Sequence, residues 1–170
     1  MYSALVIASQ FVNKSIAEGN PVTQMKLQKM VYIAHGLHLA LYGNNLVNEH
    51  FSAWKFGPVI PQIYNFYRSF GSQPITTRTR LELSSGVGIE YNVDVLSDNA
   101  ENVIEMTWNI TKDVDAIRLS NWTHLQGSPW HKAFSGAGCV DFCDATINND
   151  EIKTYFTKVF MLDAQPTTAD

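Results

Sequence analysis

The chain lacks the marks of a membrane protein and of a disulfide-rich secreted protein. No stretch of its 170 residues approaches the roughly 18 consecutive apolar residues that a membrane-spanning helix needs. Residues 1–5 lack the basic region that opens a secretory signal, so we expect a cytoplasmic protein that starts here. Cysteine occurs only as Cys139 and Cys143, which we expect to be reduced thiols, and no second pair exists to complete a zinc site.

Each half of the chain has little charge of one sign. Before residue 81 there are only two acidic residues against seven lysines and arginines, a net charge of +5, and the remainder holds five basic against fourteen acidic residues, a net charge of −9. This asymmetry predicts either two halves that attract each other or a surface for a charged partner. The whole chain carries −4, which argues against nucleic-acid binding as its main activity.

Hydrophobic periodicity predicts a mainly α fold (α+β), a single-domain helical bundle around a buried central helix, with a small β-hairpin or sheet. The domain should cover residues 1–163, and residues 164–170 should form a flexible C-terminal tail. From Met30 onward the second helix is apolar nearly all round, so it should lie at the centre. We expect helices at about residues 3–18, 23–42, 61–71, 98–110, 115–124, 128 onward and 151–161.

Two stretches have strand patterns. Residues 51–56 should form a short strand that Gly57-Pro58 breaks, because proline cannot donate to a ladder. Apolar and polar residues alternate over residues 87–95, which predicts a half-buried strand with a hairpin partner at residues 81–83.

Helix boundaries carry recognisable caps. Thr23 and Ser128 are expected N-caps, and Asp98 followed by Glu101 suggests a capping arrangement. Asn149 or Asp150 is expected to cap the last helix. On the first helix Ser9 should lie on the polar face, and the third helix should turn Ile63, Tyr64, Tyr67 and Phe70 inward.

Signatures of catalysis are also missing. There is no glycine-rich phosphate loop, since Gly86-Val87-Gly88 lacks the third glycine and the following helix. No motif places either cysteine at a helix N-terminus or a strained turn, where it would become a nucleophile. We therefore expect no enzyme and no cofactor.

Two histidines raise a metal-site alternative. His35 and His38 are three residues apart, so they can share a helix face, with a third ligand from His124, His131 or a carboxylate. Core histidines that each bond a neighbouring carbonyl explain the pattern better, and we expect no metal. A metal- or thiol-dependent hydrolase built on His35, His38 or Cys143 stays an alternative.

The first two helices could be mistaken for a helix-turn-helix. A recognition helix keeps one polar face exposed to reach the groove, and here only Gln24, Lys26, Gln28 and Lys29 could do so. DNA-binding autoregulation is therefore a further alternative.

What the chain does contain is concentrated between Lys26 and Pro61. An apolar helix includes a histidine and a glycine, His35-Gly36, and it is followed by a Trp-Lys-Phe-Gly-Pro corner at residues 54–58. Gly36 should allow another element to approach that helix closely. Lys55, beside an aromatic residue at a corner, is expected to be exposed.

These residues resemble the Panacea family, also called SocA-like or GepA-like antitoxins. The resemblance rests on Lys26-Leu27-Gln28-Lys29-Met30-Val31-Tyr32 with Ala34-His35-Gly36, on residues 53–61 with Tyr64, and on Leu119-Ser120, Thr123-His124 and Pro129-Trp130. It covers roughly residues 1–160, although residues 72–99 match nothing in the family. Its structural motif here would comprise Leu27, His35, Gly36, Trp54, Gly57, Pro58, Thr123, His124 and Trp130.

The resemblance implies a bacterial or prophage-encoded antitoxin without cofactor or reaction of its own. Such a protein neutralises a toxin by direct binding, and the toxin is usually encoded beside it. In one branch the antitoxin is instead an adaptor that hands its toxin to a ClpXP-type protease, which is the main alternative. Because interface hot spots favour large amphipathic residues, we predict a toxin-facing surface made of Lys29, Tyr32, Lys55, Tyr64, Tyr67 and Arg68.

Overall fold

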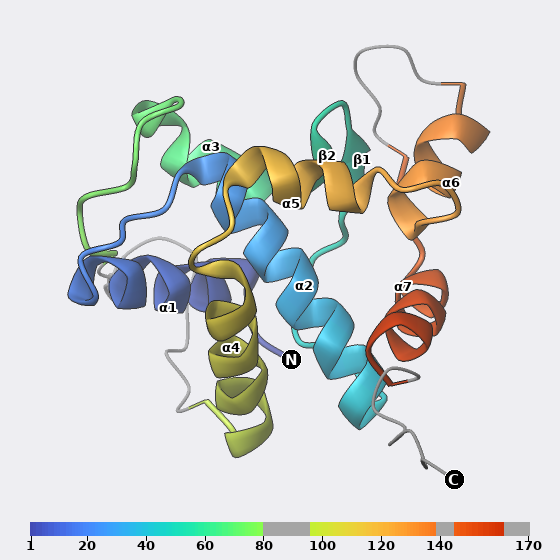
Figure 1. Ribbon diagram of the computed structural model, residues 1–170, viewed down its shortest axis with the longest axis horizontal. Coiled ribbons are helices and arrows are strands. Elements are labelled where there is room, and N and C mark those ends of the chain that lie inside the picture. The colour runs from blue at the N-terminus through green and yellow to red at the C-terminus, as the bar shows by residue number, and fades with distance from the viewer. Residues whose placement is uncertain (80–95, 139–144, 162–170) are drawn as a thin grey trace, which may run out of the picture.

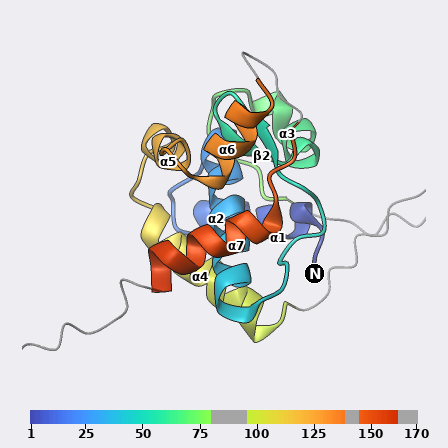
Figure 2. The same cartoon turned by 90° about the vertical axis from the view of Figure 1, so that its right-hand side faces the viewer.

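A computed structural model describes residues 1–79, 96–138 and 145–161, and helix α2 (Gln24–Tyr42) runs through its centre (Figure 1). Helix α2 contacts the helices α1 (Ala4–Ala17), α3 (Pro61–Tyr67), α4 (Asp98–Thr111), α5 (Ala116–Thr123) and α7 (Asn149–Phe156) and the strand β2 (Gly57–Val59). In the view turned by 90°, α7 lies across α2 (Figure 2). The predicted mainly α fold around a buried central helix, with a small antiparallel sheet, is confirmed.

The ends of α2 are set by Thr23, which the sequence predicted as its N-cap, and by Gly43. The Thr23 side chain accepts a hydrogen bond from the Lys26 amide, and Gly43 closes the helix in the left-handed conformation at φ 78°. Every residue from Leu27 to Leu39 is buried. A helix that is covered on all sides gains its stability from packing, so the elements around it depend on it for their positions.

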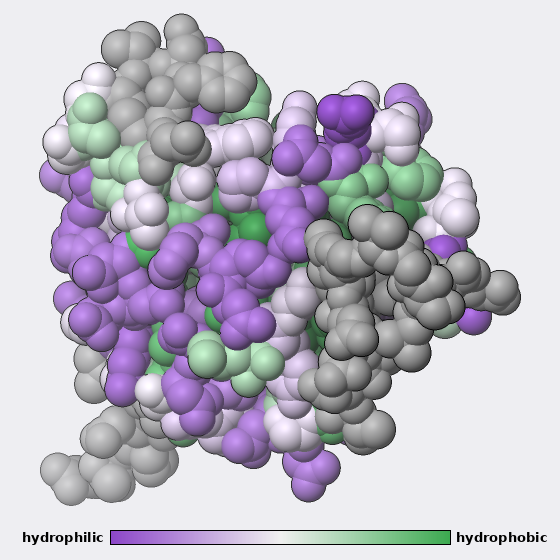
Figure 3. Space-filling view, turned by 180° about the vertical axis from the view of Figure 1, so that it is seen from behind, coloured by the Kyte–Doolittle hydropathy of each residue, from purple (hydrophilic) through white to green (hydrophobic). Residues whose placement is uncertain are grey.

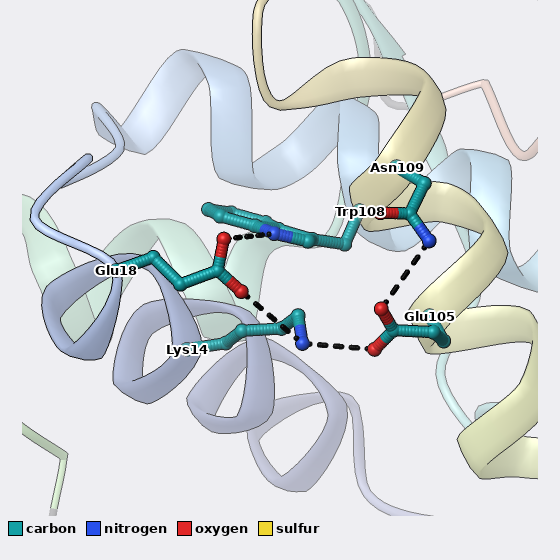
Figure 4. A network of polar contacts seen from close by, with 5 residues as sticks. All are labelled: Lys14, Glu18, Glu105, Trp108 and Asn109. Atoms are coloured by element: carbon teal, nitrogen blue, oxygen red, sulfur yellow. Dashed lines mark hydrogen bonds and ion pairs between the residues drawn. The ribbon is translucent and has the colours of Figure 1, made fainter.

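Helices α1 (Ala4–Ala17) and α4 (Asp98–Thr111) are joined by a polar network (Figure 4). Lys14 Nζ lies 2.8 Å from Glu105 Oε2 and 3.3 Å from Glu18 Oε1. The Trp108 indole N–H donates to Glu18 Oε2 at 2.9 Å. The Lys14–Glu105 pair links the basic half of the chain to the acidic half. It agrees with the first interpretation of the charge asymmetry, in which the two halves attract each other.

The strands β1 (Ser52–Trp54) and β2 (Gly57–Val59) form a hairpin in which Trp54 pairs with Gly57 across the turn residues Lys55 and Phe56. The expectation that Gly57-Pro58 breaks the strand is wrong, because these residues begin the return strand. Gly57 has φ +106°, which the turn requires. Pro58 pairs with Ala53, whose amide donates outward to the Ala145 carbonyl, so the Pro58 nitrogen faces away from β1 and no ladder bond is lost.

The remaining elements surround the hairpin and the C-terminal half of α2 (Figure 1). These elements are α3 (Pro61–Tyr67), the short 3₁₀ turn η1 (Arg68–Phe70), α5 (Ala116–Thr123), α6 (Pro129–Gly136), α7 (Asn149–Phe156) and the π-type turn η2 (Thr157–Met161). The side chain of Ser128 caps α6 by accepting from the His131 amide, and that of Asp115 caps α5 by accepting from the Arg118 amide.

Three local expectations are corrected. The N-cap of α4 is Ser97, whose hydroxyl accepts from the Ala100 amide, and Asp98 lies in the first turn instead. The N-cap of α7 is Asn148, which precedes both expected positions, Asn149 and Asp150. Ser9 is buried, because its hydroxyl donates to the Val6 carbonyl of its own helix and is thereby satisfied in the core.

The expected strands at residues 81–83 and 87–95, both cysteines and the tail at residues 164–170 lie outside the described residues. None of the described helices is long and apolar enough to cross a membrane. The face opposite to that of Figure 1 carries mostly hydrophilic residues, with hydrophobic ones in small patches between them (Figure 3).

Candidate partner-binding groove

A groove of about 660 Å³ lies between the N-terminal half of α2, the hairpin and α3. We call it the hairpin groove. Two charged residues, Lys29 and Lys55, are among its lining residues, together with the polar Gln24, Gln28 and Ser72. Its apolar wall is made of Met25, Trp54, Phe56, Val59 and Tyr64.

Polar side chains of α2 build the floor of the groove by bonding to the backbone of the hairpin and α3. The Gln28 amide donates to the Ile60 carbonyl at 3.1 Å and accepts from the Ile60 N–H at 2.9 Å, as a neighbouring strand would. Gln24 Nε2 donates to the Tyr64 carbonyl at 3.0 Å, and Lys29 Nζ donates to the Pro58 carbonyl at 3.1 Å. Gln24, Gln28 and Lys29 therefore hold the hairpin and α3 against α2 through these bonds.

Lys29 is an unusual floor residue, because only 1% of it is exposed. Burial lowers the pKa of Lys29 to about 7, since the charged form is poorly solvated there. A Cβ placed on Gly57 would lie 2.6 Å from Lys29 Cε and 2.7 Å from Thr123 Oγ1. Only glycine allows the hairpin to lie this close to both side chains.

The other side of the hairpin is held by α5 and α6. Ser120 Oγ donates to the Phe56 carbonyl at 2.9 Å, and the Trp130 indole N–H donates to the Trp54 carbonyl at 2.8 Å. The ring of His124 stacks on Trp130 with a centroid distance of 3.8 Å. Burial, and then the charge of Lys29, lower the pKa of His124. The hairpin is therefore held from two sides, by Gln28 and Lys29 of α2 and by Ser120 of α5 and Trp130 of α6. We call this arrangement the clamp.

His35 and Gly36 hold other elements against the C-terminal half of α2. His35 Nδ1 accepts a hydrogen bond from the Val47 amide, so Nε2 carries the proton and donates to Asn149 Oδ1 at 3.1 Å. Burial lowers the pKa of His35 to about 4. A Cβ on Gly36 would lie 2.5 Å from the Phe156 ring, so the glycine allows α7 to cross closely.

The histidines that raised the metal alternative are engaged in such structural bonds. His38 Nδ1 lies 2.8 Å from the Asn44 carbonyl, as expected for a core histidine. Within residues 1–79, 96–138 and 145–161, no cluster of three His, Cys, Asp or Glu side chains has a metal-binding arrangement.

The predicted partner-binding residues do not form one surface. Lys55, Tyr64 and Arg68 are exposed, and the first two line the hairpin groove. Tyr64 is 42% exposed, so the expectation that it turns inward is wrong. Whether these three residues bind a partner stays a prediction.

Lys29, Tyr32 and Tyr67 are buried, so they contribute almost no exposed surface, and their role in binding a partner stays a prediction. The Tyr32 ring packs edge-on against Phe51 and Phe156, and the Tyr67 hydroxyl lies 2.6 Å from Thr79 Oγ1. Sequence reasoning missed Phe56, which is 62% exposed at the hairpin turn. The signal for it was available: a hairpin turn centred on residues 55 and 56 projects both side chains outward.

Comparison with known proteins gives two concordant findings. Residues 27–131 match the model of the family described as "Antitoxin SocA-like, Panacea domain". The chain is 30% identical over 152 residues to Antitoxin SocA of Caulobacter vibrioides, an alignment that covers 86% of this chain and 80% of that protein. No solved structure matches the chain.

Proposed function

This chain belongs to the family of SocA-like antitoxins with a Panacea domain, and from that premise we propose that it neutralises a protein toxin by binding it directly in the hairpin groove. We further propose that it acts in the cytoplasm and catalyses no reaction of its own. The family supports the antitoxin role, and the direct mode of neutralisation is our inference.

One observation carries the location of the site. The residues that resemble the family motif hold the walls of the hairpin groove through Lys29, Ser120 and Trp130, and at its mouth lie Phe56 and Tyr64, which are 62% and 42% exposed. Exposed aromatic side chains beside a groove are typical of interaction surfaces, in which Trp and Tyr often dominate the binding energy. The clamp would thus present a preformed surface, which reduces the entropy lost on binding.

Alanine substitution of the two mouth residues tests this proposal. The partner is the product of the neighbouring reading frame that kills when expressed alone and is tolerated with this gene. We expect the double variant Phe56→Ala/Tyr64→Ala to bind this toxin at least about tenfold more weakly by calorimetry, because each side chain loses contact area at an interface centre. Survival of cells that express the toxin should fall in parallel.

The double variant Ile117→Ala/Leu125→Ala is the matched control. Ile117 and Leu125 are 65% and 52% exposed apolar residues outside the hairpin groove. This control variant should bind the toxin with the affinity of the wild type. Equal affinity of wild type and the Phe56/Tyr64 variant would contradict the groove as the site. A toxin level that falls when the antitoxin is present would contradict neutralisation by binding alone.

A further inference from the structure

The charged residues that line the hairpin groove are of one sign. Lys29 lies at its floor and Lys55 at the hairpin turn, and among the described residues that line the groove none is acidic. The rest of the lining is apolar or neutral. A partner segment that fills this groove therefore meets positive charge inside an apolar wall.

Lys29 has bonding capacity left. Its Nζ donates to the Pro58 carbonyl, whereas an ammonium group has three N–H donors. Within the part of the chain that the structure describes, no carboxylate lies within ion-pairing distance of this nitrogen. A buried ammonium without a counter-charge is costly, and the cost is reduced when a carboxylate reaches it.

We propose that the segment of the partner that enters the hairpin groove carries an Asp or Glu side chain beside large apolar side chains, and that its carboxylate pairs with Lys29. Lys55 lines the same groove. The inference rests on the proposed function for the identity of the site, and it adds the chemistry of the segment that binds there.

The groove explains why an acid alone would not suffice. Trp54, Phe56 and Tyr64 line the groove together with Lys29, so apolar side chains of the partner must exclude water there before the ion pair becomes strong. A long basic or purely apolar segment would leave the ammonium unpaired. Specificity would thus come from the cost of the wrong partner as much as from contacts to the right one.

Proton uptake is a second consequence. Because burial holds the pKa of Lys29 near 7 in the free protein and a bound carboxylate favours the ammonium form, the complex binds more protons than the free protein above that pH. Affinity should therefore decrease as the pH rises above about 7. Among the titratable groups, Lys55 on the hairpin and Tyr64 on α3 line the groove with Lys29, and burial and then the charge of Lys29 lower the pKa of His124 on α5.

The test is a selection of short random peptides displayed for binding to the full-length protein. We expect wild-type protein to enrich peptides with an Asp or Glu between aromatic or aliphatic residues, and Lys29→Met to lose the preference for the acid. A synthetic copy of the best peptide is then compared with its Asn or Gln analogue. In wild type the analogue should bind about thirtyfold more weakly or worse, as for loss of one partner of a buried charge pair.

A double-mutant cycle, which compares the acid and amide peptides on wild type and on Lys29→Met, tests whether the carboxylate pairs with Lys29. In Lys29→Met, the acid and its amide analogue should bind with nearly equal affinity, because the partner of the acid is gone. Lys153→Gln, which removes an exposed lysine of α7, should leave the thirtyfold difference intact. The comparison of acid and amide on the wild-type protein needs no variant, so it holds even if Lys29→Met fails to fold.

Enrichment of peptides without an acid, a selection that enriches nothing, or an equal acid preference in Lys29→Met would overturn the inference. Its failure can be told from that of the proposed function. Toxin binding that depends on Phe56 and Tyr64 but shows no coupling to Lys29 rejects only the carboxylate. Acidic peptides that bind in the groove without displacing the toxin reject only the groove as the toxin site.

Discussion

The side-chain nitrogen of Lys29 affects both the stability of the fold and the charge of the hairpin groove. In the unfolded chain a lysine has a pKa of 10.5, and burial lowers the pKa of Lys29 to about 7 in the folded protein. Between these values the unfolded state binds more protons than the folded state. Folding stability must therefore increase with pH across that window, and the folded state is penalised below it.

The first prediction concerns this single residue. The free energy of unfolding of the wild type, measured by urea denaturation, should rise between about pH 7 and about pH 9, with a contribution from Lys29 of up to ~1.4 kcal/mol per pH unit. Lys29→Met removes the titrating group and retains most of its apolar stem, so this rise should disappear and stability near pH 7 should be equal or higher. His35, whose pKa is lowered to about 4, titrates in a separate acidic window.

Lys153→Met is the control for that comparison. This lysine is exposed on α7, and its substitution should leave the pH profile as in the wild type. A rise of equal slope in Lys29→Met would show that another group is responsible. A flat wild-type profile over the same range would show that Lys29 keeps its charge in the folded protein.

At the scale of elements, the hairpin is clamped between α2 and α5 through a single glycine. Gly57 combines φ +106° with an approach that leaves no room for Cβ beside Lys29 and Thr123. Gly127 also has a positive φ, of 82°, but nothing lies within 4 Å of its Cβ position. Substitutions at the two glycines therefore distinguish the free-energy cost of backbone strain from the cost of a steric clash.

The second prediction compares alanine at these two positions. Gly127→Ala should cost only the strain of a positive φ, about 1 kcal/mol of unfolding free energy. Gly57→Ala should cost about 2 kcal/mol more, because the hairpin must also move away from α2 and α5. Urea denaturation of both variants with unchanged m-values measures the difference, and a similar loss in the two would contradict a tight clamp.

The sequence predicted the helices well because their signals are local. The apolar sequence of α2 and its Thr23 cap are both local features, and the structure confirms both. The same reasoning predicted α5 at about residues 115–124 and α6 from its Ser128 cap. The shifted caps of α4 and α7 differ because adjacent polar residues compete for one position.

The candidate site was less predictable because its causes are non-local. The polar α2 residues Gln28 and Lys29 looked exposed by composition, but each has a backbone partner about thirty positions away, at Ile60 and Pro58. The role of Pro58 in a strand depends on which side of the ladder its nitrogen faces. Periodicity does not contain that information, whereas the resemblance to a known family identified the clamp residues without explaining them.

At the scale of the whole molecule, the division of charge leaves basic residues exposed on the hairpin side. Lys55 and Arg68 are both exposed, Lys55 on the hairpin beside the hairpin groove and Arg68 on η1. The chain as a whole is acidic, at −4, so its net field repels an acidic partner except where local basic residues oppose it. Exposed basic residues of this kind accelerate association more than they strengthen the final complex.

The last prediction follows from that field. Reversing both charges in Lys55→Glu/Arg68→Glu should weaken toxin binding, mostly through a slower association rate, and should make the affinity less sensitive to salt, because the attraction that salt screens has been removed. Stopped-flow association at several salt concentrations measures both effects. The double variant Arg118→Glu/Lys153→Glu changes the net charge by the same amount on exposed residues of α5 and α7, outside the hairpin groove. If net charge alone governs association, the two double variants will slow binding equally; if the basic residues beside the groove guide the toxin, only the first will show both the slower rate and the flatter salt dependence.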